Sequence, residues 1–134
     1  TEFERIGELI SKANVAFVTT SESDGRLLSR PLAVLDRKFD GDLYFFTVDP
    51  SPKTGQIAED SHVNVSLQAD DNYLSIAGTA SVTHDQKLID ELWNSHAEAW
   101  FEKGCEDPGV ALLKVHADSA EYWDGGGAAS VVES

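Results

Sequence analysis

The segment Asp49-Pro50-Ser51-Pro52-Lys53-Thr54 combines residue types that bind anions. It follows an apolar run and precedes a short helical pattern, so Ser51 suits the N-cap and Pro52 the first helical position. Lys53 then lies in the first turn, where a positive side chain opposes the helix dipole. A bound anion removes this conflict, because backbone N–H groups, a hydroxyl and an ammonium converge on it. The alternative is a solvated lysine in an ordinary capped helix, and the segment alone does not decide between the two.

Arg30 is the second residue that could contact an anion. Within the strand pattern 26–35 it shares a face with apolar residues, so its charge needs a partner or a path to solvent. Pro31 cannot donate to a sheet ladder, which predicts an edge or a bulge at this point. An edge-strand arginine that reaches solvent explains Arg30 alone. Together with Ser51 and Lys53, Arg30 favours a clamp for a phosphate group.

Trp93 and Trp100 lie seven residues apart in a pattern that predicts one long helix over 85–101. They would therefore share one side of that helix. Core packing or a contact between two subunits is the plain explanation for each ring. Stacking on a flat cofactor is the alternative.

The charge of the chain excludes several classes of partner. Asp and Glu outnumber Lys and Arg by 24 to 10, for a formal net charge of −14, which repels nucleic acid and anionic membranes. An anionic ligand would need the few cations to be gathered at its site. The four histidines lack metal-ligand spacing, and no apolar run approaches the roughly 20 residues that span a bilayer. With Cys105 as the only cysteine, the expectation is a soluble, cytoplasmic protein.

Turn signals and alternating apolar residues predict an antiparallel fold. Helices on most strand connections, as parallel units require, are missing. The expected fold is mainly β: a six-stranded antiparallel barrel with peripheral helices over residues 1–124, followed by a flexible tail over 125–134. The expected strands are 15–20, 26–35, 43–48, 63–69, 74–82 and 110–123, and the expected helices are 3–13, 55–60 and 85–101.

Short motifs in a fixed order give the sequence a resemblance to a known family. It resembles the general stress protein 26 branch of the pyridoxamine 5′-phosphate oxidase-like flavin-binding proteins. The motifs include Ser29-Arg30-Pro31, Gly41-Asp42-Leu43-Tyr44-Phe45-Phe46-Thr47, Ser51-Pro52-Lys53, Trp100-Phe101 and Glu121-Tyr122-Trp123-Asp124.

The resemblance implies a six-stranded split barrel that forms a homodimer and holds flavin mononucleotide (FMN) in a groove at the dimer interface, with FAD as an alternative cofactor. By motif position, Arg30 and Lys53 would contact the phosphate and Ser51 would donate a hydroxyl. The residues implied along the ribityl chain and the ring are Ser29, Leu32, Phe46 and Thr47, and those implied for the partner's aromatic wall are Trp93 and Trp100.

The function implied is that of an FMN-dependent oxidoreductase acting on a small molecule, with a role in the stress response. No residue demands the role of a general acid or base, so catalytic residues are not assigned. A non-catalytic dimer that binds or sequesters flavin is a second function class. A third is a structural dimer with an empty groove, in which Arg30 pairs with a carboxylate.

Overall fold

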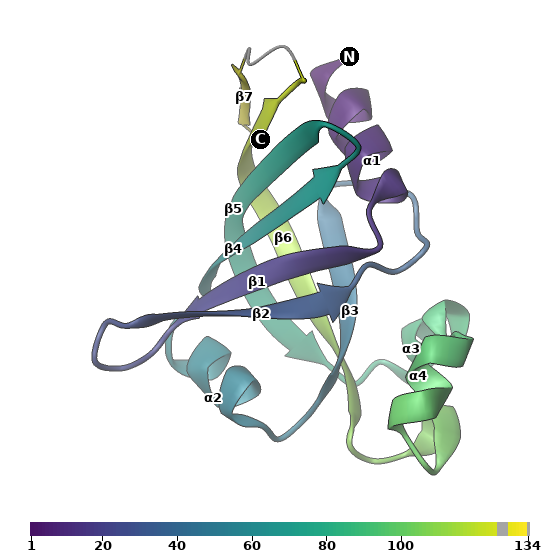
Figure 1. The fold of residues 1–134 in the computed structure, drawn as a ribbon. Helices are drawn as coiled ribbons and strands as arrows, with labels where there is room; N and C mark the ends of the chain where they lie inside the picture. The colour runs from purple at the N-terminus through teal and green to yellow at the C-terminus, as the bar shows by residue number, and fades with distance from the viewer. Residues whose placement is uncertain (126–128, 134) are drawn as a thin grey trace.

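Antiparallel strands form most of the chain in the computed structural model, which describes residues 1–125 and 129–133 (Figure 1). The strands alternate buried and exposed residues, as one-sided packing on a core requires. The elements are α1 (Glu2–Lys12), β1 (Val15–Ser21), β2 (Leu27–Ala33), β3 (Asp42–Val48), α2 (Pro52–Glu59), β4 (His62–Ala69), β5 (Asn72–Thr83), α3 (Gln86–Leu92), α4 (Ser95–Trp100), a 3₁₀ turn (Gly104–Glu106), β6 (Val110–Trp123) and β7 (Ala129–Glu133).

The strands pair in the order β2-β1-β4-β5-β6-β3, and every pairing is antiparallel. The sheet curls until its two end strands, β2 and β3, approach each other (Figure 1). Within the described residues no backbone ladder joins these two strands. The register shifts between Ala77 and Gly78, where the long β5 bends against β6. The fold is therefore the expected mainly β barrel, split between β2 and β3.

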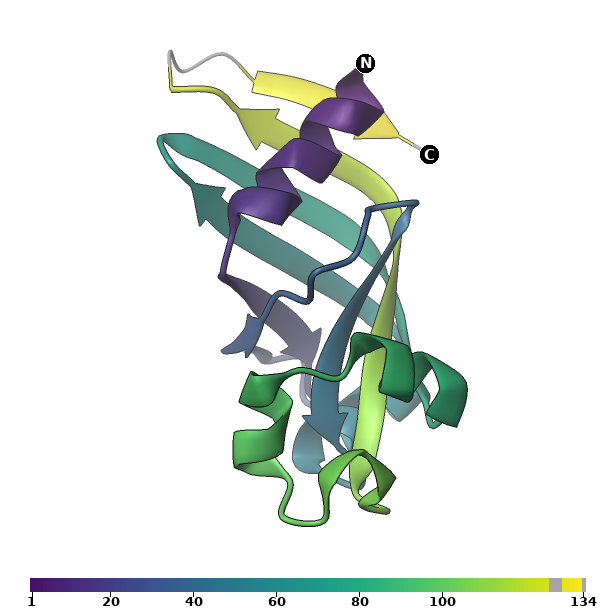
Figure 2. The same ribbon diagram turned by 90° about the vertical axis from the view of Figure 1, so that its right-hand side faces the viewer.

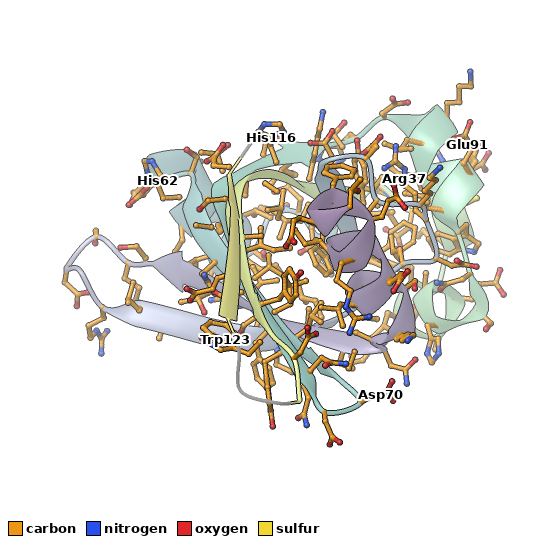
Figure 3. The ribbon with its side chains drawn as sticks, turned by 90° about the horizontal axis from the view of Figure 1, so that it is seen from above. Arg37, His62, Asp70, Glu91, His116 and Trp123 are labelled. Atoms are coloured by element: carbon orange, nitrogen blue, oxygen red, sulfur yellow. The ribbon has the colours of Figure 1, made fainter. Side chains whose placement is uncertain are left out.

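The helices lie at the ends and on one side of the barrel. Seen from above, α1 lies over the opening of the curled sheet (Figure 3), and it buries Ile6, Leu9 and Ile10 in the main core. At the other end, α2 follows β3 (Figure 1). A second, smaller core forms where α3 and α4 cover the lower half of β3 and β6 (Figure 2). None of the described helices is long and apolar enough to cross a membrane.

One sequence expectation needs correction. The single helix over 85–101 is wrong: the chain leaves helical geometry at Trp93, and Asn94 caps α4 by accepting a hydrogen bond from the Ala97 N–H at 2.9 Å. A strong N-cap in mid-pattern starts a new helix and changes the direction of the axis. Of the expected tail 125–134, residues 126–128 and 134 lie outside the described residues, whereas 129–133 form β7, which pairs with β6.

Candidate functional site

A groove of about 370 Å³ lies at the split of the barrel. Its two long sides come from β2 and β3, α4 covers it, and Lys53 of α2 lies at its border. The volume is within the usual range for small-molecule sites. The lining residues are Pro31, Leu32, Ala33, Leu35, Phe46, Thr47, Val48, Lys53, Asn94, His96, Ala97, Trp100 and Phe101.

The backbone of β2 turns unpaired polar groups toward the split. Val34 N donates to Asn14 O at 3.0 Å, and in an antiparallel ladder every second residue has its bonds directed to the same partner. By this alternation Ser29, Pro31 and Ala33 direct their backbone groups away from β1. Because the proline stands at a non-bonding position of an end strand, its missing N–H removes no ladder bond. The predicted edge at Pro31 is confirmed.

The backbone of β3 does the same from the opposite side. Asp49 N donates to Gly109 O at 3.0 Å and Ala117 N donates to Gly41 O at 2.9 Å, which fixes the bonding pairs between β3 and β6. Phe46 and Val48 therefore direct their N–H and C=O groups away from β6 and toward the groove. The groove thus offers backbone donors and acceptors along both sides, between mostly apolar side chains.

Arg30 is held beside the groove by neutral groups. Its Nη1 donates to Thr20 Oγ1 at 2.6 Å and its Nη2 donates to Gln56 Oε1 at 3.3 Å. Burial lowers the pKa of the Arg30 guanidinium, with a smaller opposing effect from the Glu22 charge. Within the described residues Arg30 forms no ion pair with a carboxylate. Since Arg30 and Leu32 alternate to the same face of β2, the guanidinium adjoins the groove wall.

Lys53 brings a second cation to the same place. Ser51 caps α2 by accepting from the Thr54 N–H at 3.3 Å, and Thr54 Oγ1 accepts from the Ser51 N–H at 2.9 Å. Lys53 is therefore in the first helical turn, as predicted. Burial lowers its pKa, and the charge of Arg30 lowers it further. Neither a hydrogen bond nor an ion pair links Lys53 to another described residue, so the like charges of Lys53 and Arg30 act on each other and neither forms an ion pair with a described carboxylate.

Thr47 has an unusual buried hydroxyl. The residue is 4% exposed and lines the groove at β3. Its Oγ1 finds no hydrogen-bond partner in the described part of the chain. A buried hydroxyl without a partner costs about 1–3 kcal/mol. A polar group of a ligand in the groove is the kind of partner that would satisfy it.

The two tryptophans have different environments. Trp93 packs edge-on against Phe46, with ring centroids 5.4 Å apart, and against Phe101 at 6.0 Å. It belongs to the second core and does not line the groove. Trp100 lines the groove and leaves 82% of its surface exposed. The helix break therefore separates the two rings that the sequence placed on one helix side.

Of the residues expected from the sequence, the structure brings Leu32, Phe46, Thr47, Lys53 and Trp100 together at the groove, with Arg30 beside Lys53. The remaining side chains have other contacts.

Ser29 lies on the opposite face of β2, where its hydroxyl contacts Thr19 Oγ1 at 2.6 Å. Only its backbone faces the split. The Ser51 hydroxyl serves the helix cap.

Sequence reasoning missed Thr20 and Gln56, which hold Arg30. The available signals were a threonine on the buried face of β1 and a glutamine one turn after Lys53 on α2. It also missed His96, which lines the groove on α4. Apart from Lys53, this histidine is the only ionisable side chain among the described lining residues, and no carboxylate lines the groove.

Comparisons with known proteins agree with this architecture. The chain is 32% identical to protein bli-3 of Neurospora crassa over 129 residues, which cover 87% of the chain and 62% of bli-3. General stress protein 26 of Bacillus anthracis has a similar fold, with a TM-score of 0.86 and 24% identity over 99% of this chain and 98% of that one. The general stress FMN/FAD binding protein of Xanthomonas citri gives a TM-score of 0.78 and 26% identity over 90% and 87% of the two chains.

The chain thus spans less than two thirds of the length of bli-3. A sequence profile of the family described as "Pyridoxamine 5'-phosphate oxidase like" matches residues 1–133, which is nearly all of the chain. This match shows that the chain belongs to the pyridoxamine 5′-phosphate oxidase-like family.

Proposed function

We propose that this chain binds FMN at the groove, with the phosphate held by Arg30 and Lys53. The observation that carries the proposal is the pair itself. Two adjacent cations without a carboxylate partner are unfavourable in any protein, and they stand out in a chain with a net charge of −14. A phosphomonoester carries a charge of about −1.5 to −2 at pH 7, which matches the two cations.

The remainder of the groove suits the rest of the cofactor. Leu32, Phe46 and Trp100 offer apolar surface for a planar ring. The free backbone edges of β2 and β3 offer the donors and acceptors that a ring with polar edges requires. The Thr47 hydroxyl lacks a partner that a ribityl hydroxyl or a ring atom would supply. FMN is preferred to FAD because a terminal phosphate gives both cations a single dianionic partner, whereas each phosphate of a dinucleotide carries about one charge.

The proposed activity is that of an oxidoreductase acting on a small molecule, with a role in the stress response supported by the general stress protein relatives. A bound flavin would supply the electron or hydride transfer. The chain's own residues would hold the phosphate and cover one wall of the ring. His96 and Lys53 are the titratable side chains of the described lining, so a proton needed at the groove would come from one of them or from water.

A homodimer is part of the proposal. The outer face of β1, β2 and β4 carries no Asp, Glu, Lys or Arg side chain among the described residues, although these types make up 25% of the whole chain. Three of its apolar members are strongly exposed: Val15 at 48%, Phe17 at 50% and Leu27 at 70%. A surface that lacks Asp, Glu, Lys and Arg and exposes large apolar side chains is typical of a protein interface.

This surface also adjoins the groove. Pro31 and Ala33 belong both to the uncharged face and to the groove lining. A second copy seated on the face would therefore border the cofactor. We also place the protein in the cytoplasm, because a single unpaired cysteine is usual in a reducing compartment.

Flavin titration tests the binding proposal. The purified protein, cleared of bound ligands, is titrated with FMN, FAD and riboflavin while the quenching of flavin fluorescence is followed. We expect FMN to bind more tightly than riboflavin by at least about tenfold, since a charge-assisted phosphate contact contributes about 1.5–3 kcal/mol. Equal affinities for FMN and riboflavin, or no binding, would refute the assignment of Arg30 and Lys53.

Turnover and assembly need separate measurements. Anaerobic mixing of the FMN-loaded protein with reduced nicotinamides should bleach the flavin absorbance if the protein is an oxidoreductase. Full retention of the oxidised spectrum with NADH, NADPH and dithionite-generated reduced deazaflavin would instead support a flavin-binding protein without turnover.

Light scattering during gel filtration should give twice the mass of one chain, and Phe17→Lys should shift this mass to that of the monomer.

A further inference from the structure

Gln56 lies between the Arg30 guanidinium and a nearby carboxylate. Its Oε1 accepts from Arg30 Nη2 at 3.3 Å and from Thr20 Oγ1 at 2.7 Å, while its Nε2 lies 3.5 Å from Glu22 Oε1. The amide orientation follows from the chemistry of its neighbours. A guanidinium only donates and a carboxylate only accepts, so reversing the amide would set N–H groups against N–H groups.

Thr20 completes the arrangement on the side of the barrel. The residue is 1% exposed, and its hydroxyl accepts from Arg30 Nη1 at 2.6 Å. Because the Thr20 hydroxyl gives its single proton to Gln56 Oε1, the three hydrogen bonds among Thr20, Arg30 and Gln56 each join a donor to an oxygen. The guanidinium is thus bound on two of its N–H groups by neutral oxygens. Its remaining donors are left for another partner.

Glu22 is the carboxylate that could take those donors. Its charge is the one that acts on Arg30 in the described structure. The Glu22 carboxylate instead forms an ion pair with Arg26 on the β1–β2 hairpin, where Glu22 Oε2 lies 2.8 Å from Arg26 Nη2. If the Gln56 amide were absent, the carboxylate would have no polar group between it and the guanidinium. A direct Arg30–Glu22 pair would satisfy the cation and repel a phosphate.

We propose that Gln56 is a positioning residue that orients Arg30 for the cofactor phosphate and keeps the Glu22 carboxylate away from it. Gln56 lies three residues after Lys53, so one face of α2 supplies both the ammonium and this amide. The site would therefore select a phosphorylated flavin partly through a neutral residue that holds no ligand itself. This inference rests on the proposed binding of FMN.

The variants Gln56→Glu, Gln56→Ala and Gln56→Ala with Glu22→Gln test it, each titrated with FMN and with riboflavin. Gln56→Glu nearly preserves the shape and gives Arg30 a carboxylate at the same position. We expect its FMN affinity to fall by about 10- to 100-fold, while riboflavin affinity stays within about twofold. Gln56→Ala should also weaken FMN, and adding Glu22→Gln should restore most of the loss, because the competing charge is gone.

Ala58→Glu is the matched control, since it adds the same charge to an exposed position on α2, two residues away and on another face. Its FMN affinity should stay within about threefold of the wild type. Riboflavin binding reports that the groove of each variant is folded. If Gln56→Glu binds FMN as tightly as the wild type, or loses both ligands equally, or if Glu22→Gln restores nothing, the role of Gln56 is refuted while FMN binding stands. A wild-type chain that binds no FMN refutes both proposals.

Discussion

Replacing Lys53 with methionine should have opposite effects with and without flavin. Lys53 is a half-buried cation beside Arg30, and burial together with the Arg30 charge lowers its pKa below the ordinary 10.5. The unfolded chain therefore binds its proton more tightly than the folded chain, so stability rises as the pH rises from the lowered pKa toward 10.5. Below the lowered pKa the lysine is charged in both states, and its full cost is present. Removing that charge should stabilise the flavin-free protein by up to about 1 kcal/mol, a value limited by solvent screening.

With FMN the sign reverses. Loss of a charge-assisted contact should weaken FMN by about 1.5–3 kcal/mol, whereas riboflavin should be unaffected. A ligand stabilises the folded state by about 2.7 kcal/mol at 100 times its Kd, so Lys53→Met should lose most of the stabilisation that a fixed FMN concentration gives the wild type.

Urea unfolding with and without FMN measures both effects in one experiment. Lys87→Met serves as the control, because Lys87 is exposed on α3 and does not line the groove. It should change stability by less than about 0.5 kcal/mol in either condition. A variant at Lys53 that is less stable without flavin, yet keeps the full stabilisation by FMN, would show that the lysine supports the fold and not a phosphate.

Four further substitutions test other parts of the structure. Thr47→Val removes the unpartnered hydroxyl, so it should raise the stability of the flavin-free protein by about 1 kcal/mol in urea and weaken FMN by about two- to tenfold in the fluorescence titration. Gly78→Ala should lower the free energy of unfolding in urea by more than about 2 kcal/mol, because the added Cβ would meet a backbone carbonyl of β6. In Gly55→Ala on α2 the added Cβ meets no atom within 4 Å, so this change should raise the free energy of unfolding by about 0.5–1 kcal/mol. The hydrogen bond from His84 lowers the pKa of Asp49, so the ionised carboxylate stabilises the fold above its ordinary pKa. This stability is lost as the pH falls through the lowered pKa. Asp49→Asn should therefore reduce the thermal midpoint at pH 7 and have no effect at a pH below the lowered pKa.

The barrel could be predicted because its strands carry local signals. The alternation in Val63, Val65 and Leu67 and the glycine within β5 correspond to a paired strand and a bulge. The start of α2 was also predictable, since Ser51 and Pro52 are typical of a helix start and place Lys53 in the first turn. In these cases the information lies within a few adjacent residues.

The features that sequence reasoning missed depend on contacts between distant residues. Helix α3 ends before Trp93 and Asn94 caps α4, but the apolar pattern of the sequence continues past both residues. Strand β7 forms because β6 extends beyond β3 and leaves an edge for it. The environment of Trp93 follows from the helix break and from Phe46 on β3. Thr20 and Gln56 come together only after β1, β2 and α2 have packed.

The electrostatics of the site also explain why it is assembled from separate elements. An arginine beside a lysine is costly, and in a chain with 24 acidic residues a carboxylate could easily neutralise either one. Here Glu22 is paired with Arg26 and separated from Arg30 by an amide, while the groove lining that is described contains no carboxylate. Neutral partners on β1 and α2 hold Arg30 without an ion pair, which is the arrangement expected of a site whose counter-ion arrives with a ligand.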